Sequence, residues 1–373
     1  MIDFKVYQSP FSWRYGSEKM RTLFSEENKF KTYRKIWVAL AKTQHEAGLI
    51  SQEELSDLEK NKDSINIERI LEIEKETNHD LVAALREFSE KAKIGGGKIH
   101  LGATSQDIID NAETLRNKEA LDLIEKKLIE VLKLLEEKII QFADLPCMGY
   151  THLQPAEPTT LGYRFAFYAQ DLFLDLEHLR FVKKIVKGKG LKGAVGTAAS
   201  YSALLKQTNT TPSQLEEKFL KDLGIDAVLI SSQVNPRKFD FFIVNTLASI
   251  SSSISKFAFD LRIMQSPGFG EWAEPFGEKQ VGSSAMPFKK NPLTSEKVCS
   301  LARYVTSLPS VVLENASVSL LERTLDDSAN KRVIMPEAFL ATDEILETAK
   351  KLISGMTVNE NKSKQNLNTY DPV

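Results

Sequence analysis

The chain has 373 residues, of which 42% are hydrophobic, and it carries 49 basic and 51 acidic residues for a net charge of -2. This length allows a substantial hydrophobic core and predicts two or three domains. Because both charge signs are nearly balanced and mixed along the chain, neither a nucleic-acid partner nor a membrane surface is expected. A small-molecule substrate fits this composition better.

The ends of the chain and its cysteines predict a reduced, cytoplasmic protein. The start, MIDFKVYQSP, lacks a basic segment followed by an apolar run, and no stretch reaches the roughly 18 apolar residues of a membrane span. Cys147 and Cys299 are too few for a disulfide framework or a cysteine-based zinc site. Both thiols are therefore expected to be reduced and buried.

The first part of the chain predicts a smaller helical domain, residues 1–105, in which Ser51 and Glu54 have the spacing of a capping box. A single long helix is predicted over 106–144. Its apolar residues recur at spacings of three and four: Leu121, Ile124, Leu128, Val131, Leu135, Ile139 and Phe142.

Further long helices follow along the chain. One is predicted over 159–187, ending at Gly188 and Gly190 because glycine can adopt the left-handed backbone that closes a helix. Another follows Pro236 and reaches Met264, and two more are predicted over 292–307 and 328–354. Such lengths favour a mainly α long-helix bundle over a mixed sheet fold. The predicted bundle domain covers 106–356.

One connection is too long for an ordinary helix-to-helix loop. Residues 266–291 contain four glycines and three prolines, which exclude regular helix across most of this segment. The same segment holds Trp272, Phe276, Met286 and Phe288, more apolar content than disorder favours. A mobile active-site lid is the interpretation that fits both features.

The five histidines differ in their sequence surroundings. His45 and His178 lie within amphipathic helices and are expected to be surface or packing residues, and His100 leans the same way. His79, in ETNHD, and His152, on an irregular turn between prolines, are candidates for chemistry. The histidines lack the spacing of a helical metal site, so a metal is not expected.

Two glycine-containing segments have both a structural and a functional interpretation. GAVGTAAS, 193–200, lacks the lysine and the preceding strand of a phosphate loop, which favours a tight turn between closely packed helices. GSSAMPFKKNP, 282–292, gathers serines, a lysine pair and an asparagine on one loop, where they could transfer protons and bind anions. A solvated glycine-rich loop is the alternative.

Taken together, three segments resemble the motifs of the fumarase, aspartase and argininosuccinate lyase superfamily. GYTHLQPAEPTTLG, 149–162, resembles the first motif, HLGATSQDIIDNA, 100–112, the second, and GSSAMPFKKNP the third. RYGSEKM, KGAVGTAAS, SSQVNPRKFD and ERTLDDSANKR, 322–332, look like the adenylosuccinate lyase family. The resemblance implies a helical homotetramer without a cofactor, in which three subunits build each active site.

The implied reaction is the anti elimination of fumarate from a succinylated amine. By resemblance, Ser283 is the general base, His152 the general acid, and Lys289 and Asn291 donate to the dianionic intermediate. Serine is a poor base in water, so the lid must close and surround its oxygen with donors or positive charge. His79 is a further catalytic candidate, because the sequence contains no distances that separate it from His152.

Resemblance also implies the substrate-binding residues, because a nucleotide monophosphate needs fixed positive and hydroxyl donors. The implied substrates are adenylosuccinate and the succinylated carboxamide ribonucleotide of purine biosynthesis, which would be cleaved to AMP and AICAR. The implied binding residues are Arg14, Tyr15, Asn78, Asp80, Thr104, Ser105, Thr151, Gln233, Asn291, Arg323, Ser328 and Arg332.

Two features depart from the family's pattern. Lys297, in LTSEK, stands where some members have an arginine, and the chain ends at TYDPV, where the family continues through further helices. Residues 357–373 are accordingly predicted to begin a truncated third domain. The alternatives are argininosuccinate lyase, another lyase of the superfamily, or a catalytically silent structural homologue that has kept the bundle.

Overall fold

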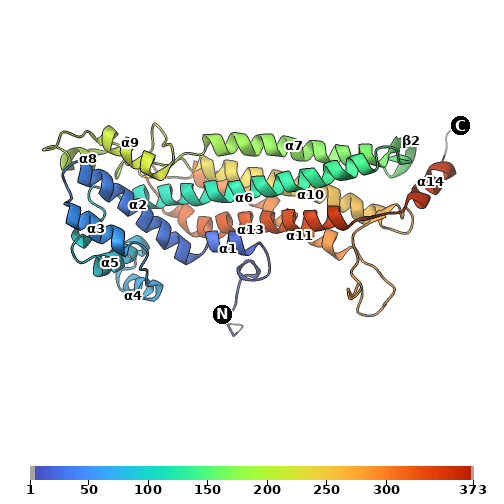
Figure 1. The fold of residues 1–373 in the computed structure, drawn as a ribbon, viewed down its shortest axis with the longest axis horizontal. Helices are drawn as coiled ribbons and strands as arrows, with labels where there is room; N and C mark the ends of the chain where they lie inside the picture. Colours follow the sequence, from blue (N-terminus) through green and yellow to red (C-terminus); the bar gives the residue numbers. More distant parts are fainter. Residues whose placement is uncertain (1–4, 371–373) are drawn as a thin grey trace.

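In a computed structural model, residues 5–370 are described; residues 1–4 and 371–373, parts of the predicted first and third domains, lie outside the described residues. Long helices run side by side along the molecule, and the short N-terminal helices gather at one end (Figure 1). This arrangement confirms the predicted mainly α long-helix bundle. The bundle helices are α6 (Ser105–Gln141), α7 (Leu161–Ile185), α10 (Lys238–Met264), α11 (Leu293–Ser307), α12 (Pro309–Ser317) and α13 (Asp326–Gly355).

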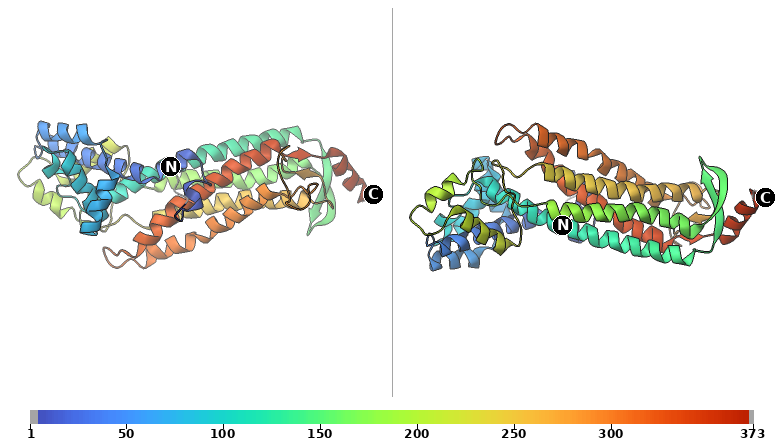
Figure 2. Two further views of the ribbon diagram at one scale, coloured as in Figure 1. Left: turned by 90° about the horizontal axis from the view of Figure 1, so that it is seen from below. Right: turned by 90° about the horizontal axis from the view of Figure 1, so that it is seen from above.

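Most of the remaining elements lie at the two ends of the bundle (Figure 2). At the first end are α2 (Glu26–Glu46), α3 (Gln52–Asn61), α4 (Ile67–Thr77), α5 (Asp80–Lys91), η2 (Gly96–Lys98), α8 (Ala199–Leu204) and α9 (Pro212–Leu223). The short elements η1 (Pro10–Ser12) and α1 (Glu18–Leu23) lie midway along the bundle, against α13 (Figure 1). At the other end are β1 (Pro146–Thr151), β2 (Gln154–Thr160), β3 (Trp272–Ala273), β4 (Thr357–Val358) and α14 (Glu360–Thr369). We call these the N-domain end and the hairpin end.

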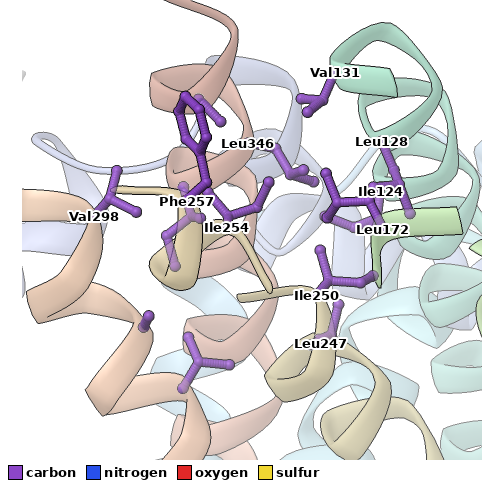
Figure 3. Packing of buried hydrophobic residues seen from close by; sticks show 14 of the residues in the cluster. Ile124, Leu128, Val131, Leu172, Leu247, Ile250, Ile254, Phe257, Val298 and Leu346 are labelled. Carbon is purple, nitrogen blue, oxygen red and sulfur yellow. The ribbon is translucent and has the colours of Figure 1, made fainter. Parts of the chain in front are cut away.

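The bundle core forms around α10, which packs against α7, α11 and α13. Apolar side chains from α6, α7, α10, α11 and α13 meet there, among them Ile124 and Leu128 of α6 and Ile250 of α10 (Figure 3). The predicted stripe of α6 is buried as expected. Ser251 is also fully buried, and its hydroxyl lies 3.2 Å from the hydroxyl of Thr342. Its small side chain lets α10 approach α13 closely.

A second hydrophobic cluster builds the N-domain end. It includes Trp37 and Phe88, the first turns of α6, and residues of α8 and α9 such as Tyr201 and Phe219. Helices α8 and α9 follow α7 in the chain, so two separated segments build this core. The predicted domain boundaries at 105 and 356 stay a prediction.

Local signals explain some helix ends and not others. The capping box of α3 forms as predicted, with Ser51 and Glu54 exchanging hydrogen bonds. The predicted glycine closure of α7 is wrong: the helix ends at Ile185, and Gly188 instead accepts from Val228 and donates to Asp226. The backbone there pairs with residues 226–228, and this pairing replaces a helix cap.

The irregular turn predicted around His152 is the tip of a β-hairpin. Strands β1 and β2 pair antiparallel, with Thr151 opposite Gln154. Prolines in β2 are tolerated because a two-stranded ribbon has free edges. The two turn residues, His152 and Leu153, both have left-handed backbones, at φ 54° and 60°. Such a turn normally uses asparagine and glycine, so strain is concentrated where His152 is presented.

The long connection, residues 266–291, divides into two parts. Trp272 is only 1% exposed and packs against the rings of Phe165 and Phe257, so its assignment to a lid is wrong. Strand β3, which contains Trp272, pairs with β4 and anchors this first part to the core. From Gly277 onward most of the side chains are exposed. Motion of this second part stays a prediction.

Candidate active site

A cavity of about 380 Å³ lies at the N-domain end, between that domain and the bundle. Four of the residues implied for substrate binding line it: Asp80 at the start of α5, Arg323 just before α13, and Ser328 and Arg332 in the first turns of α13. Arg332 is 62% exposed and forms an ion pair of 2.6 Å with Asp80. The cavity therefore contains an accessible guanidinium group that could bind an anion.

A chain of buried ion pairs supports the wall of this cavity. Arg237 reaches Asp110 at 2.8 Å and Asp327 at 2.6 Å, and Asp327 accepts from Arg323 at 3.0 Å. Burial alone would raise the pKa of Asp110, but the positive charges of Arg237 and Lys331 outweigh burial and lower it. Asp327 links Arg237 to Arg323 and so fixes the position of the Arg323 guanidinium group.

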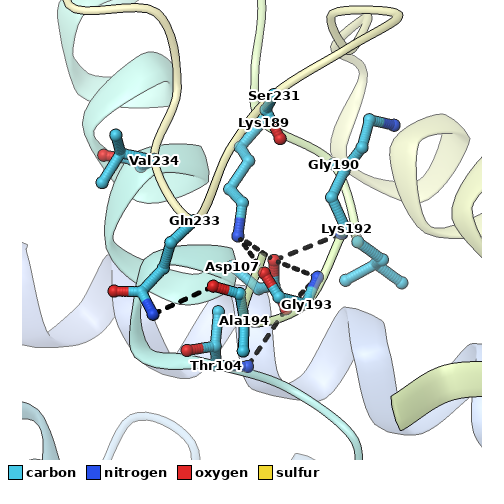
Figure 4. Close-up of polar contacts among 12 residues, drawn as sticks. Thr104, Asp107, Lys189, Gly190, Lys192, Gly193, Ala194, Ser231, Gln233 and Val234 are labelled. Carbon is cyan, nitrogen blue, oxygen red and sulfur yellow. Dashed lines mark hydrogen bonds and ion pairs between the residues drawn. The ribbon is translucent and has the colours of Figure 1, made fainter. Parts of the chain in front are cut away.

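Beside the cavity, the start of α6 is tied to the glycine segment 193–200. Thr104 is the N-cap residue of α6, and its backbone N–H donates to Asp107 at 3.1 Å. Asp107 also pairs with the fully buried Lys189 at 2.6 Å and accepts from the amide of Gly193 (Figure 4). Ser105 is the first residue of the same helix.

Gln233 lies on the other side of the glycine segment. Its side-chain amide donates to the carbonyl of Ala194 at 3.1 Å, and its backbone N–H donates to Glu322, next to Arg323. At Gly196, a β-carbon would come within 2.0 Å of the Ser231 carbonyl, so only glycine allows these two loops to meet. The predicted tight turn thus brings Thr104 and Gln233 to one place.

Two histidines lie near this end of the molecule. His79 is the N-cap residue of α5, where its Nδ1 accepts from Val82 at 3.4 Å, and its side chain is 47% exposed. Asn78, just before it, ends α4 in a left-handed conformation. His100 accepts a hydrogen bond of 3.1 Å from Trp37, and burial lowers its pKa.

Arg14 and Tyr15 lie elsewhere, on the segment before α1. Gly16, next in the chain, donates to Glu344 of α13 at 3.1 Å. Lys297 of α11 forms an ion pair with the same carboxylate at 2.7 Å. Glu344 therefore joins the segment that carries Arg14 and Tyr15 to the helix that carries Lys297.

The implied acid and base both lie at the hairpin end, and both are accessible. Thr151 and His152 are exposed, at and beside the tip of the β1–β2 hairpin. Ser283 begins a turn in which its hydroxyl oxygen accepts from the amides of Ala285 and Met286, at 3.4 and 3.2 Å. Figure 1 shows the hairpin and this loop on opposite sides of the bundle end.

The two ends of the loop around Ser283 are in contact with each other. Asn291 donates from its side chain to the Gly282 carbonyl at 2.9 Å. A β-carbon on Gly282 would lie 2.1 Å from the carbonyl of Lys289, so glycine is required for this approach. Lys289 itself is exposed. Ser283, Lys289 and Asn291 therefore share one compact loop.

In one chain, then, the predicted site residues form separate groups. Asp80, Arg323, Ser328 and Arg332 share the cavity, and Thr104, Ser105 and Gln233 lie beside it. The β1–β2 hairpin, with Thr151 and His152, and the loop around Ser283 lie at the hairpin end of the bundle. No single chain assembles the implied acid, base and phosphate-binding residues in one site.

Comparison with known proteins identifies the relatives. A family model described as "Lyase" matches residues 14–306. The adenylosuccinate lyase of Schistosoma mansoni is 38% identical, with 100% of this chain and 78% of the relative covered. The chain belongs to the adenylosuccinate lyase family. The enzymes of Saccharomyces cerevisiae and Pyrococcus abyssi are also 38% identical and are covered over 75% and 78% of their lengths, with 96% of this chain covered in both.

Solved structures show the same fold. A fumarate lyase from a Mesorhizobium species aligns with a TM-score of 0.84 and 26% identity, over 97% of this chain and 80% of that chain. A 3-carboxy-cis,cis-muconate lactonizing enzyme from Pseudomonas putida aligns with a TM-score of 0.87 at 23% identity over the same shares. The long-helix bundle is thus shared with lyases of the superfamily.

Several polar residues around the candidate site were not predicted from the sequence. Asp107 with Lys189, and Arg237 with Asp110, are almost fully buried ion pairs. The sequence offered no local signal for these pairs, because the partners lie about 80 or more residues apart along the chain. Across residues 5–370, no group of three or more His, Cys, Asp or Glu side chains could hold a metal ion, and no helix could span a membrane.

Proposed function

We propose that this lyase cleaves adenylosuccinate to AMP and fumarate, and the succinylated carboxamide ribonucleotide to AICAR and fumarate. The observation that carries the proposal is the cavity in which Arg323, Ser328 and Arg332 converge, in a chain 38% identical to adenylosuccinate lyases. Guanidinium and hydroxyl donors suit a nucleotide phosphate, and an arginine fork can bind it through two parallel hydrogen bonds.

In the proposed chemistry, Ser283 removes the proton from the carbon beside a succinyl carboxylate. The electron pair left on that carbon then forms the double bond of fumarate as the carbon–nitrogen bond breaks. Two backbone amides already donate to the Ser283 oxygen, and such donors favour its ionised form. Lys289 and Asn291, on the same loop, would stabilise the charge that develops on the carboxylate.

His152 is proposed to protonate the departing nitrogen. Its position at an exposed hairpin tip leaves the imidazole free to enter a site built by another copy of the chain. Histidine suits this step because its ordinary pKa is close to neutrality. His79, at the edge of α5, remains the second candidate for proton transfer.

The separation of these groups supports a homotetramer with shared active sites. The hairpin, the Ser283 loop and the cavity must come from different copies if they are to meet around one substrate. Helix α7 offers a surface for this contact: Tyr163, Phe167, Leu174 and Phe181 lie on one face of the helix and are 50 to 74% exposed. An apolar stripe of this kind marks a protein interface.

The reaction is tested by fumarate release from the purified protein, with adenylosuccinate and argininosuccinate as parallel substrates and EDTA present. We expect release from adenylosuccinate alone. Release from argininosuccinate only would keep the elimination and remove the nucleotide from the proposal. Silence with both substrates would favour the catalytically silent homologue.

The shared site is tested by mixing two inactive variants, His152→Gln and Ser283→Ala, after dissociation and reassembly. If the acid and base of one site come from different copies, some sites in the mixed assembly contain both intact residues, and activity returns. Reassembly of each variant alone is the control. Activity that stays absent in verified mixed assemblies would contradict sharing.

A cytoplasmic location stays a prediction of the sequence.

A further inference from the structure

A buried carboxylate holds the start of α11, where the loop that contains Ser283 returns to the bundle. Glu274 is 3% exposed, and it accepts from the amides of Thr294 and Ser295 at 3.1 and 2.8 Å and from the Ser295 hydroxyl at 2.7 Å. The N-cap residue, Pro292, provides no side-chain cap. Glu274 therefore caps α11 from the opposite side of the loop.

Gln265 completes this connection. Its side-chain oxygen accepts from the amide of Glu274 at 3.0 Å, and its side-chain nitrogen donates to the carbonyl of Lys290 at 2.9 Å. Residues before the exposed segment 277–291 are thus bonded directly to residues at and after its end. We call Gln265, Glu274 and Ser295 the clasp.

The clasp bears on the residues that the proposed reaction uses. It holds the carbonyl of Lys290, between Lys289 and Asn291, and Asn291 in turn bonds to Gly282 beside Ser283. We propose that Glu274 is a positioning residue that sets the loop of Ser283, Lys289 and Asn291 in register with the bundle. This inference rests on the proposed function, and it assigns Glu274 no contact with the substrate.

The chemistry of the carboxylate favours positioning over general packing. A buried carboxylate is costly unless donors surround it, and here the two backbone amides and one hydroxyl that donate to it all belong to the first turn of α11. Glu274→Gln keeps the side-chain volume, but its amide nitrogen would face a backbone N–H in place of one acceptor. The substitution should therefore release one side of the clasp while the hydrophobic core stays intact.

A matched control lies at the opposite end of the molecule. Glu87 is also fully buried, where it pairs with Arg34 and accepts from the amide of Asn66 at 3.0 Å. Glu87→Gln should lower the melting temperature without touching the loop. Both variants are compared with the unsubstituted protein, well below their melting temperatures, for kcat, for KM and for trypsin cleavage at Lys279, Lys289 and Lys290.

For Glu274→Gln we expect kcat to fall about 10- to 100-fold, with KM within about threefold, because a small displacement of reacting groups slows the chemical step. Trypsin cleavage in the loop should accelerate, and Glu87→Gln should change neither readout. If Glu274→Gln unfolds, Gln265→Ala replaces it, since this change opens the clasp without leaving a buried charge.

The outcomes separate the two proposals. Faster cleavage with unchanged kcat would overturn the positioning role, and lower kcat with unchanged cleavage would overturn the clasp as its cause. If the unsubstituted protein releases no fumarate from either succinyl nucleotide, the proposed function fails. The cleavage rates then still decide whether Glu274 holds the loop.

Discussion

The two ends of the bundle differ in how their polar side chains are held. At the N-domain end, buried ion pairs such as Asp107 with Lys189 and Arg237 with Asp110 hold the cavity and its surroundings in place. At the hairpin end, His152 is exposed and Ser283 lies on a loop whose side chains mostly face solvent. The proposed binding residues are thus held in place within one chain, while the proposed acid and base are exposed at the other end. The following predictions test that contrast.

The largest expected effect is at the hairpin end. Ser283→Ala should lower kcat about 100- to 10,000-fold, the usual contribution of a positioned general base, because alanine has no oxygen that could accept the proton. The melting temperature should change by no more than about a degree, since the side chain is partly exposed and off the core. Fumarate release and thermal unfolding measure the two effects.

Ser284→Ala is the neighbouring control, because its side chain is exposed in the same loop. It should keep activity within about threefold of the unsubstituted protein, as expected for a surface hydroxyl. Loss of activity in Ser284→Ala with normal turnover in Ser283→Ala would move the base to the second serine.

At the N-domain end, the expected effect is on the free energy of unfolding. Lys189→Met leaves the carboxylate of Asp107 buried without its cation, which should cost about 3–5 kcal/mol of unfolding free energy. Denaturant titration measures it. Lys350→Met is the matched control, since Lys350 pairs with Glu130 and Glu347 near the surface, and it should cost about 0–1 kcal/mol. Equal losses would remove the distinction between buried and surface pairs.

A smaller effect is expected from the accessible cation of the cavity. Arg332→Ala should lower kcat/KM for adenylosuccinate about 10- to 150-fold, mainly through KM, because a charged hydrogen bond contributes about 1.5–3 kcal/mol. Steady-state kinetics measure it. Arg303→Ala, an exposed arginine of α11, should leave kcat/KM unchanged. An unaffected Arg332→Ala enzyme would remove phosphate binding from this cavity.

The smallest effect concerns pH. Burial lowers the pKa of His100 in the folded protein, so the unfolded chain binds its proton more readily below about pH 6.5. The stability that this neutral histidine contributes is present above that pH and is lost as pH falls toward the folded pKa. Melting temperatures from pH 7.5 to 5 should therefore fall less steeply in His100→Gln. An identical slope would show that His100 does not contribute.

Much of the bundle was predictable from local patterns. The stripe predicted over 106–144 became α6, Ser105–Gln141, because its apolar side chains face one continuous core. Other long helices were placed within about two residues of their ends. The predicted glycine closure of α7 was wrong, because residues 188 and 226–228 pair with each other, which no local signal reports.

The residues of the candidate site were predictable from the sequence, but their positions in space were not. Motif resemblance singled out His152, Ser283 and Arg332, and neighbouring residues such as Thr104 and Gln233 do meet beside one turn. It did not reveal that one chain separates the hairpin from the cavity by the length of the bundle. The sequence predicts Trp272 to be part of a lid, but its strand β3 pairs with β4 and its side chain is buried in the core.

The sequence by itself determined the helix-forming segments and the chemical groups, because hydrophobic periodicity and side-chain type are local properties. Only the tertiary structure decided which charges are buried together, which part of the loop is anchored, and which end presents each group. The physical reason is that a buried ion pair such as Arg237 with Asp110, or a clasp such as Glu274 with Ser295, depends on distance in space. Spacing along the chain does not contain that distance.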